Sequence, residues 1–264
     1  MTSKYLPKLA RATLFFNTVV ASGLRNAHIC WSSKKYCETP IYIVRIVSKN
    51  GGVNLISENV VNSQEEALEF INKHGVVTLF PIKGTSFPSL YHATKGNRQE
   101  KFDRAWGWAD DLAMEKLIHY GKLVRKQVSL VSLDLFPSLY KLCRTRELSD
   151  VAKKMLNFLE THGSTSTTVL RKRLGFWGKE KKNTFTKAVD ELQLTFAIAI
   201  VGREKPPRMT HIYDLTERWM PKSLFKGAEK IDRAEAKAKI IAKLMENQVI
   251  SRPTDAEKLL YLPS

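Results

Sequence analysis

Long apolar runs are missing from this chain of 264 residues. The longest candidate, around residues 14–24, is interrupted by Asn17, Thr18 and Ser22. A membrane-spanning helix needs about eighteen predominantly apolar residues in succession. The sequence therefore excludes an integral membrane protein and predicts a soluble one.

Cysteine is scarce, and the familiar catalytic and metal-binding motifs are missing. Cys30, Cys37 and Cys143 form no Cys-x-x-Cys pair, and the six histidines lack metal-ligand spacing. The run Lys83-Gly84-Thr85 has the wrong residue order for a phosphate-binding loop, and no Gly-x-Ser-x-Gly segment is present. We therefore expect reduced thiols, no metal site and no cofactor.

Positive charge, in contrast, is abundant. Lys and Arg total 43 against 26 Asp and Glu, which gives a formal net charge of +17. Such an excess favours a polyanionic partner or an anionic membrane surface. The first 37 residues carry basic residues and no acid. This extension is interpreted as a disordered basic arm, as a stretch upstream of the true translation start, or as an organelle transit peptide.

The pattern of apolar and turn-forming residues predicts an α+β chain, mainly helical, with winged helix-turn-helix units in two packed modules. The elements expected in the first half are a helix capped by Ser63, strands over residues 76–82 and 128–135, and a helix over residues 112–120. We divide the chain into a basic extension (1–52), an α+β module with a Trp-Gly-Trp segment (53–145), a winged helix (146–221) and a C-terminal helical region that packs on the body (222–264).

The second half has the element order of a winged helix, which is three helices followed by a β-hairpin. The helices are expected over residues 149–162, 166–174 and 179–193, and the strands over residues 195–201 and 209–214. After Pro221, a linker rich in Lys and Gly leads to a helix over residues 232–249. Its expected buried face consists of Ala234, Ala238, Ile241 and Met245.

The third helix of this winged helix is the expected DNA-contacting element. A projection at 3.6 residues per turn places Phe185, Ala188, Val189 and Leu192 inward. The predicted DNA contacts are Lys179, Asn183, Thr186 and Lys187 on this helix, Arg171, Lys172 and Arg173 before it, and Arg203, Lys205 and Arg208 at the wing. Glu180 and Asp190 also point outward and would repel phosphate, which favours a clamp over a sequence reader. Solvated surface charges, or a module that binds protein, are the alternatives.

Five segments, taken in order, resemble the AlkZ-like winged-helix family, and in particular short relatives of the crosslink-repair DNA glycosylases. They are residues 79–84, 88–90, 106–108, 120–122 and 213–215. The likeness covers residues 64–241, and it implies tandem winged helices around a DNA channel. The family's glycosylases remove alkylated bases through a Gln-x-Gln or Gln-x-Asp element. That element is absent here, because no glutamine has Gln or Asp two residues later.

Other residues could assist base release, which needs a carboxylate or amide that holds water beside an oxocarbenium-like sugar. The candidate catalytic residues are Asp110, Asp111 and Glu115. A candidate pocket for a base or phosphate consists of Lys83, Trp106, Trp108, Tyr120 and Lys122. In the alternative interpretation the tryptophans belong to the core, and Asp110 or Asp111 caps the next helix.

These observations together predict a protein that binds double-stranded DNA in repair or damage recognition, located in the cytoplasm with the nucleoid. The first alternative is an active monofunctional DNA glycosylase that acts on alkylated or crosslinked bases. The second alternative is a transcription regulator.

Overall fold

The computed structural model describes residues 45–47, 53–55, 61–144, 146–204 and 210–260. The chain divides into two compact units, residues 1–58 and 59–264. In the first unit, β1 (Arg45–Val47) pairs with β2 (Val53–Leu55) as an antiparallel hairpin. The rest of the basic extension lies outside the described residues.

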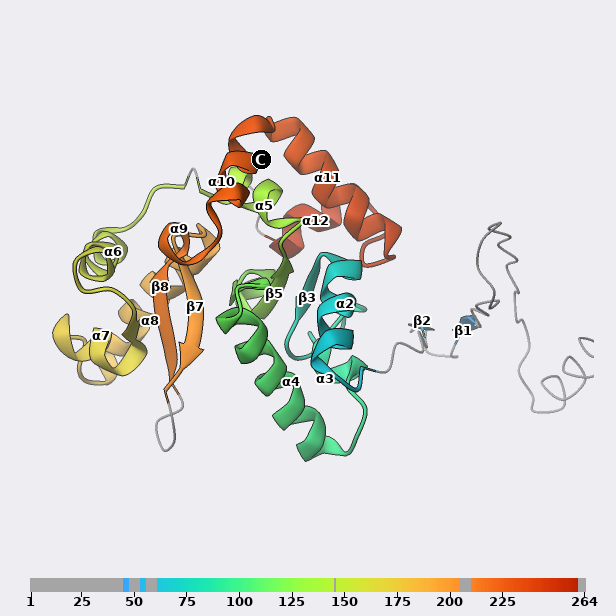
Figure 1. Ribbon diagram of the computed structural model, residues 1–264, viewed down its shortest axis with the longest axis horizontal. Coiled ribbons are helices and arrows are strands. Elements are labelled where there is room, and N and C mark those ends of the chain that lie inside the picture. The colour runs from blue at the N-terminus through green and yellow to red at the C-terminus, as the bar shows by residue number, and fades with distance from the viewer. Residues whose placement is uncertain (1–44, 48–52, 56–60, 145, 205–209, 261–264) are drawn as a thin grey trace, which may run out of the picture. The chain divides into compact units, whose positions relative to one another are not determined.

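The second unit begins with a module of helices and strands, the first module, which spans residues 61–132. Its elements are α2 (Gln64–His74), β3 (Val76–Thr78), α3 (Leu90–Ala93), α4 (Arg98–Met114), β4 (Ile118–Lys122), the short 3-10 turn η1 (Val124–Lys126) and β5 (Val128–Ser132). The three strands form an antiparallel sheet in the order β3-β5-β4 (Figure 1). The order along the chain is therefore helix, strand, helix, helix, strand, strand.

The second module, residues 150–215, repeats that order. Its elements are α6 (Asp150–His162), β6 (Thr165–Ser166), α7 (Thr167–Arg173), α8 (Lys179–Leu194), β7 (Ile198–Arg203) and β8 (His211–Leu215). Its antiparallel sheet has the equivalent order, β6-β8-β7. The three helices and the hairpin predicted for this half are present, and the predicted inward residues of α8 are buried. The resemblance implied such a tandem arrangement, but the elements expected for the first half from the residues alone did not give this order.

The two modules correspond residue by residue where the long helix meets the next strand. After α4 and after α8, a non-glycine residue has positive φ two positions before the strand begins: Lys116 (φ 61°) and Phe196 (φ 54°). Gly121 and Gly202 then occupy the same ladder position, followed by Lys122 and Arg203. A β-bulge between Ile200 and Gly202 accommodates the extra residue of β7.

The long helix of the first module corrects the sequence analysis. We expected a helix over residues 112–120, but α4 begins at Arg98, and residues 118–122 form β4. The cap is Asn97, whose side chain accepts hydrogen bonds from the backbone N–H groups of Gln99 and Glu100, while Glu100 completes a capping box. Residues 106–111 therefore lie inside a helix, and neither Asp110 nor Asp111 caps one. The spacing of Ala105, Ala109 and Leu112 gives α4 its buried face.

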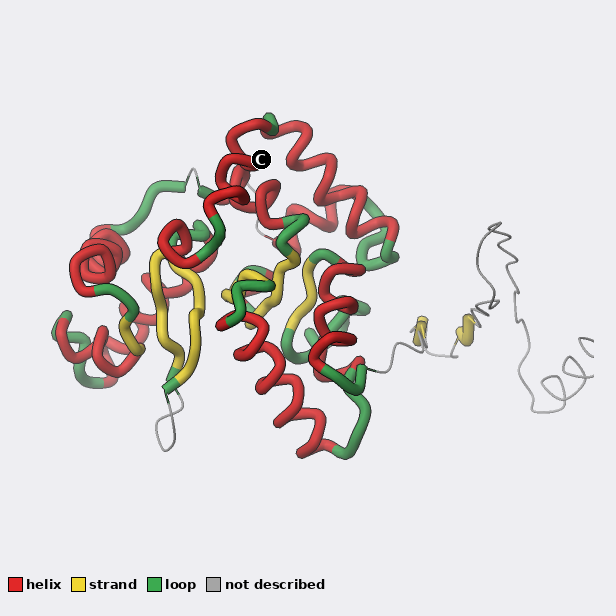
Figure 2. The backbone as a smooth tube through the Cα atoms, in the orientation of Figure 1, coloured by secondary structure: helices red, strands yellow, loops and turns green. Residues whose placement is uncertain are grey.

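The first sheet is buried on both faces. Val77 and Leu130 belong to a core that continues into the second module, whereas Val76 and Val131 belong to a core formed with the C-terminal helices. These helices are α9 (Thr216–Trp219), α10 (Lys222–Lys230), α11 (Arg233–Glu246) and α12 (Pro253–Leu260), and α5 (Phe136–Cys143), which lies between the two modules in the chain, packs with them. Figure 2 shows that helices make up most of this unit, with the strands confined to small sheets.

Two further expectations about the C-terminal region are wrong. The segment after Pro221 is helix α10 rather than a linker. Helix α11 buries Ala236, Ile240 and Leu244, not the predicted stripe that includes Ala234 and Met245. Both stripes have helical spacing of three or four residues, and the stripe that packs inward, against α5, contains Ile240 and Leu244. None of the described helices is long and apolar enough to cross a bilayer.

Candidate nucleic-acid interface

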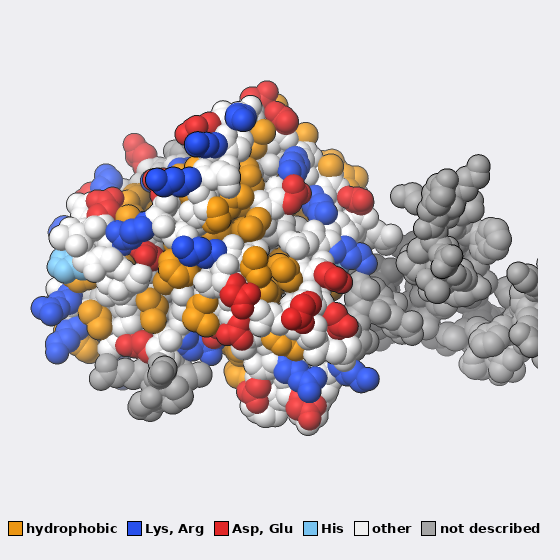
Figure 3. Space-filling model, viewed as in Figure 1, with side chains coloured by type: hydrophobic (Ala, Val, Ile, Leu, Met, Phe, Trp, Pro, Cys, Tyr) orange, Lys and Arg blue, Asp and Glu red, His pale blue; other side chains and the backbone are white. Residues whose placement is uncertain are grey.

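The outer face of α7 and α8 is exposed and basic. Between Arg171 and Lys187 the sequence holds seven basic residues and one acid. All four residues predicted to face outward on α8 are exposed, and so are two of the three on α7: Lys179, Asn183, Thr186, Lys187, Lys172 and Arg173. Figure 3 shows Lys and Arg side chains at the edge of the molecule over α7, whereas Asp and Glu gather over α2 and α4. Positive surface charge of the described residues is therefore prominent on the second module.

The turn between α7 and α8 is braced from both sides. Arg171 is half-buried and donates from Nη2 to the backbone oxygen of Phe176 (3.3 Å), while Lys181 Nζ donates to the backbone oxygen of Gly175 (3.2 Å). The Phe176 ring packs against Phe185, with ring centroids 5.7 Å apart. Arg171 thus stabilises the turn, and the more exposed cations are its neighbours on α7.

The residue after Phe176 in this turn points to solvent. Trp177 is 56% exposed, the most exposed of the large hydrophobic side chains in the described part of the chain. Gly178 follows with φ 89° and starts α8 without a side-chain cap. The backbone N–H groups of the first turn of α8 therefore have no side-chain acceptor from this N-cap residue.

Two ion pairs join the modules. Arg203, predicted at the wing tip, lies on β7 and places Nη2 3.0 Å from Asp110 Oδ2 of α4. Its guanidinium also lies over the Trp106 ring, 4.1 Å from the centroid. In the reciprocal pair, Lys122 Nζ of β4 lies 3.1 Å from Asp190 Oδ1 of α8. We call these two pairs the reciprocal latch.

The helices and strands that carry these ion pairs also pack on each other in a reciprocal way. Helix α4 packs on β7, helix α8 packs on β4, and the two strands lie against each other. The Lys122 backbone N–H donates to the Gln193 side-chain oxygen (3.0 Å), which adds a further contact on the α8 side. The reciprocal latch thus occupies the C-terminal halves of both long helices, and their N-terminal halves remain outside this contact.

Asp110 is largely shielded from solvent, with its side chain 16% exposed. Asp110 Oδ1 and Trp106 Nε1 are buried, and each lacks a hydrogen-bond partner among the described residues. Burial, opposed by the nearby Arg203 charge, raises the pKa of Asp110 to about 6. Burial, assisted by the Arg203 and Lys122 charges, lowers the pKa of the adjacent His211 to about 4. This cluster includes the predicted residues Trp106, Asp110 and Tyr120, but it is an interior contact between modules.

The remaining predicted site residues lie in varied places. Asp111 is half-buried, and Glu115 is exposed and accepts from Gln64 Nε2 (3.1 Å). Trp108 is half-buried against the shared core, and Lys83 is exposed in the loop between β3 and α3. Lys205 and Arg208 lie outside the described residues. Among the residues that are described, no group of three His, Cys, Asp or Glu side chains could hold a metal ion.

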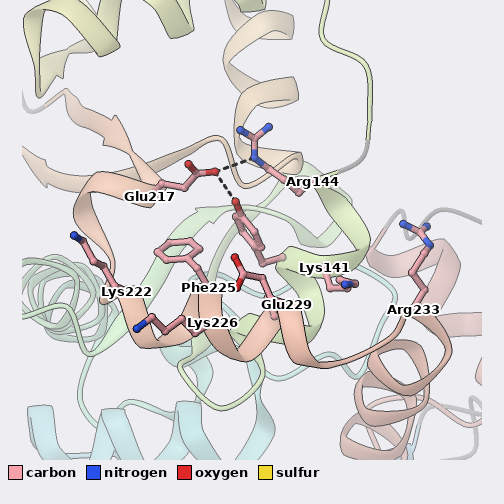
Figure 4. Close-up of a pocket in the computed structure, with 10 residues that line it drawn as sticks. Lys141, Arg144, Glu217, Lys222, Phe225, Lys226, Glu229 and Arg233 are labelled. Carbon is pink, nitrogen blue, oxygen red and sulfur yellow. Dashed lines mark hydrogen bonds and ion pairs between the residues drawn. The ribbon is translucent and has the colours of Figure 1, made fainter.

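A cavity of about 590 Å³ lies among α5, α10 and the start of α11 (Figure 4). Glu217 at its edge accepts from the Tyr140 hydroxyl (2.5 Å) and from Arg144 Nε (3.4 Å). Burial and the hydrogen bond to Glu217 raise the pKa of Tyr140 to about 12. The rest of the lining includes the basic Lys222 and Lys226 together with Phe225 and Glu229. Sequence reasoning missed this cavity because it predicted neither α5 nor α10.

Comparison with known proteins finds similarity to one protein family. A family model described as AlkZ related matches residues 61–261, which include both modules and the C-terminal helices. No curated protein and no solved structure matches the chain.

Proposed function

Because the chain belongs to the AlkZ-related family, we propose that its two repeated modules are winged helices that bind double-stranded DNA in repair or damage recognition. The observation that carries this proposal is the exposed basic face of α7 and α8 on a module with winged-helix element order. In that fold the third helix approaches the major groove and the hairpin forms the wing. Helix α8 is then the DNA-contacting helix of the second module.

The reciprocal latch supports this proposal by removing an electrostatic objection. An unpaired Asp190 on the outer face of α8 would repel phosphate. Its carboxylate instead pairs with Lys122 of the first module, so its charge is largely compensated. Lys179, Asn183 and Lys187 stay exposed on α8. Glu180 is the one acidic residue that remains among the exposed cations of this helix.

We propose binding rather than base release as the activity. Asp110, the candidate with a raised pKa, is engaged by Arg203 in the interior, where a water held for attack on a sugar would not reach substrate. A glycosylase would instead have to use Asp111 or Glu115. A transcription regulator, the other alternative, would show one strongly preferred sequence and no response to damage.

The test is a set of titrations with intact, alkylated and single-stranded oligonucleotides at low salt. We expect the wild-type protein to bind duplex, and the double variant Lys179→Ala with Lys187→Ala to bind it more weakly, because two phosphate-facing cations are removed. The matched control is Lys230→Ala with Lys258→Ala, which removes the same charge from exposed positions on α10 and α12. Absence of duplex binding by the wild type at low salt would exclude the proposed function.

A further inference from the structure

We propose that the Trp177 side chain stacks on an unpaired or extruded base of bound DNA and gives the protein a preference for duplexes with a disrupted base pair. This inference rests on the proposed DNA-binding function and adds a recognition element to it. It starts from an exposed aromatic side chain that the sequence analysis did not single out.

The backbone that carries Trp177 is held in place before any ligand binds. Gly175 (φ 72°) and Gly178 (φ 89°) flank the segment in left-handed conformations. Phe176 is anchored against Phe185, and Arg171 and Lys181 bind the turn's carbonyl oxygens. The turn therefore presents the indole from a fixed base, and little backbone ordering remains for the binding step.

The indole itself is left without an aromatic neighbour. At 56% exposure it makes no ring or cation–π contact within the described part of the chain. Covering this exposed apolar surface with a planar partner would be favourable. Trp177 also adjoins Gly178, the residue from which α8 starts, so it lies at the end of the helix that we place on DNA.

The charge around Trp177 favours a nucleic acid over a protein as the partner. Lys172, Arg173, Lys179 and Lys182 are exposed on the helices on either side, against the single acid Glu180. A polyanion with planar rings matches both the cations and the indole. In the first module the equivalent turn, residues 94–97, contains no aromatic residue and ends in the cap Asn97. The recognition element is therefore specific to the second module.

An intact duplex would use the cations but not the ring, because its bases already stack on one another. A mismatched, bulged or damaged position has an unstacked base whose face is available at lower cost. Every base can stack on an aromatic side chain, so the binding preference would depend on whether a base is unpaired and not on the sequence.

The experiment compares two duplexes of the same sequence, one fully paired and one with a single unpaired base. Wild-type protein is expected to bind the second more tightly. Trp177→Ala is expected to weaken binding to it by roughly 5- to 100-fold, which corresponds to the loss of one stacked base, and to change the intact duplex little. Trp177→Phe should retain most of the preference. Quenching of tryptophan fluorescence by the unpaired-base duplex should be lost in Trp177→Ala.

Met245→Ala is the matched control, because Met245 is another exposed apolar side chain (41%) but lies on α11. If the wild type binds intact duplex without preferring the unpaired base, or if Trp177→Ala weakens both duplexes equally, the inference is wrong and the proposed function stands. If the wild type binds neither duplex, both are wrong. A shift of Trp177→Ala to a smaller species in size-exclusion chromatography would assign the ring to a contact between copies and overturn the inference.

Discussion

Asp110 and Asp190 occupy the same position in the two modules, and each carboxylate pairs with a cation of the other module. Arg203 and Lys122, the two cations, follow glycines at equivalent ladder positions of β7 and β4. Asp110 and Arg203 are largely shielded, with side chains 16% and 14% exposed. Loss of one partner from such a pair leaves the other charge buried without compensation.

Replacement of Arg203 by Met should lower the free energy of unfolding at pH 7 by about 3 kcal/mol, because Asp110 loses its counter-charge. The loss should be smaller at pH 5. The folded-state pKa of Asp110, about 6 with Arg203 present, lies above its ordinary value of 3.8, and it rises further without the guanidinium. The stability from this group is therefore lost as pH rises through the folded pKa. Urea unfolding at pH 7 and at pH 5 measures the loss of stability in Arg203→Met.

The control is Arg252→Met, which removes an exposed arginine and should change stability by under about 0.5 kcal/mol. A loss in Arg252→Met equal to that in Arg203→Met would contradict the role of burial.

Salt dependence tests the contacts of α8 separately from overall affinity. Each phosphate contact contributes about one to the slope of log affinity against log salt concentration. The variant Lys179→Ala with Lys187→Ala should therefore reduce the magnitude of that slope by about 2. Fluorescence anisotropy over a range of salt concentrations gives the slope. An unchanged slope would show that these two lysines do not contact phosphates.

Acid should destabilise the protein through three shielded histidines. Burial lowers the pKa of His119 to about 3 and, together with nearby positive charge, lowers the pKa values of His74 and His211 to about 4. These groups stay neutral when folded but take up protons when unfolded, so stability falls as pH drops below about 6.5.

The contribution of a single buried histidine to this acid destabilisation can be measured at His119. Neither ring nitrogen has a partner in the described structure, and the ring stacks on Phe196 with centroids 4.6 Å apart. Between pH 7 and pH 5 the wild type should lose about 2 kcal/mol through this residue alone. His119→Leu should lose that much less over the same interval in chemical unfolding. An identical pH dependence would mean that His119 titrates normally.

Base release distinguishes binding from glycosylase activity. Incubation of the wild type with alkylated duplex should yield no free base by chromatography, because Asp110 is largely shielded and paired with Arg203. Asp111→Asn supplies the decisive comparison. Release by the wild type that disappears in this variant would replace the binding proposal with the glycosylase alternative.

The second module was largely predictable because its signals are local. Ser149 caps α6, and the spacing of Phe185, Val189 and Leu192 fixes which face of α8 is buried. These features depend only on residues within one or two turns of one another. The outward face of α8 follows from the same spacing.

The first module was less predictable because α4 contains conflicting local signals. Gly107, a residue of low helix propensity, lies inside it, and Gly96 just before the cap is typical of a loop. The ion-pair partners of Asp110 and Asp190 could not be predicted from the sequence for another reason. Each ion pair joins segments far apart in the chain, so only the packing of α4 on β7 and α8 on β4 brings the charges together. Asp190 accordingly looked like a repulsive surface charge.

The reciprocal latch has the arrangement of an isologous dimer interface, in which each of two copies gives the other the same contact. In a homodimer any substitution would appear on both sides at once. Within one polypeptide the two sides can differ, and they do: Lys122 stands opposite one aspartate and Arg203 opposite the other, while Gln193 binds across the contact where its counterpart is Ala113. Covalent linkage thus allows the contact residues of one half to differ without a matching change in the other.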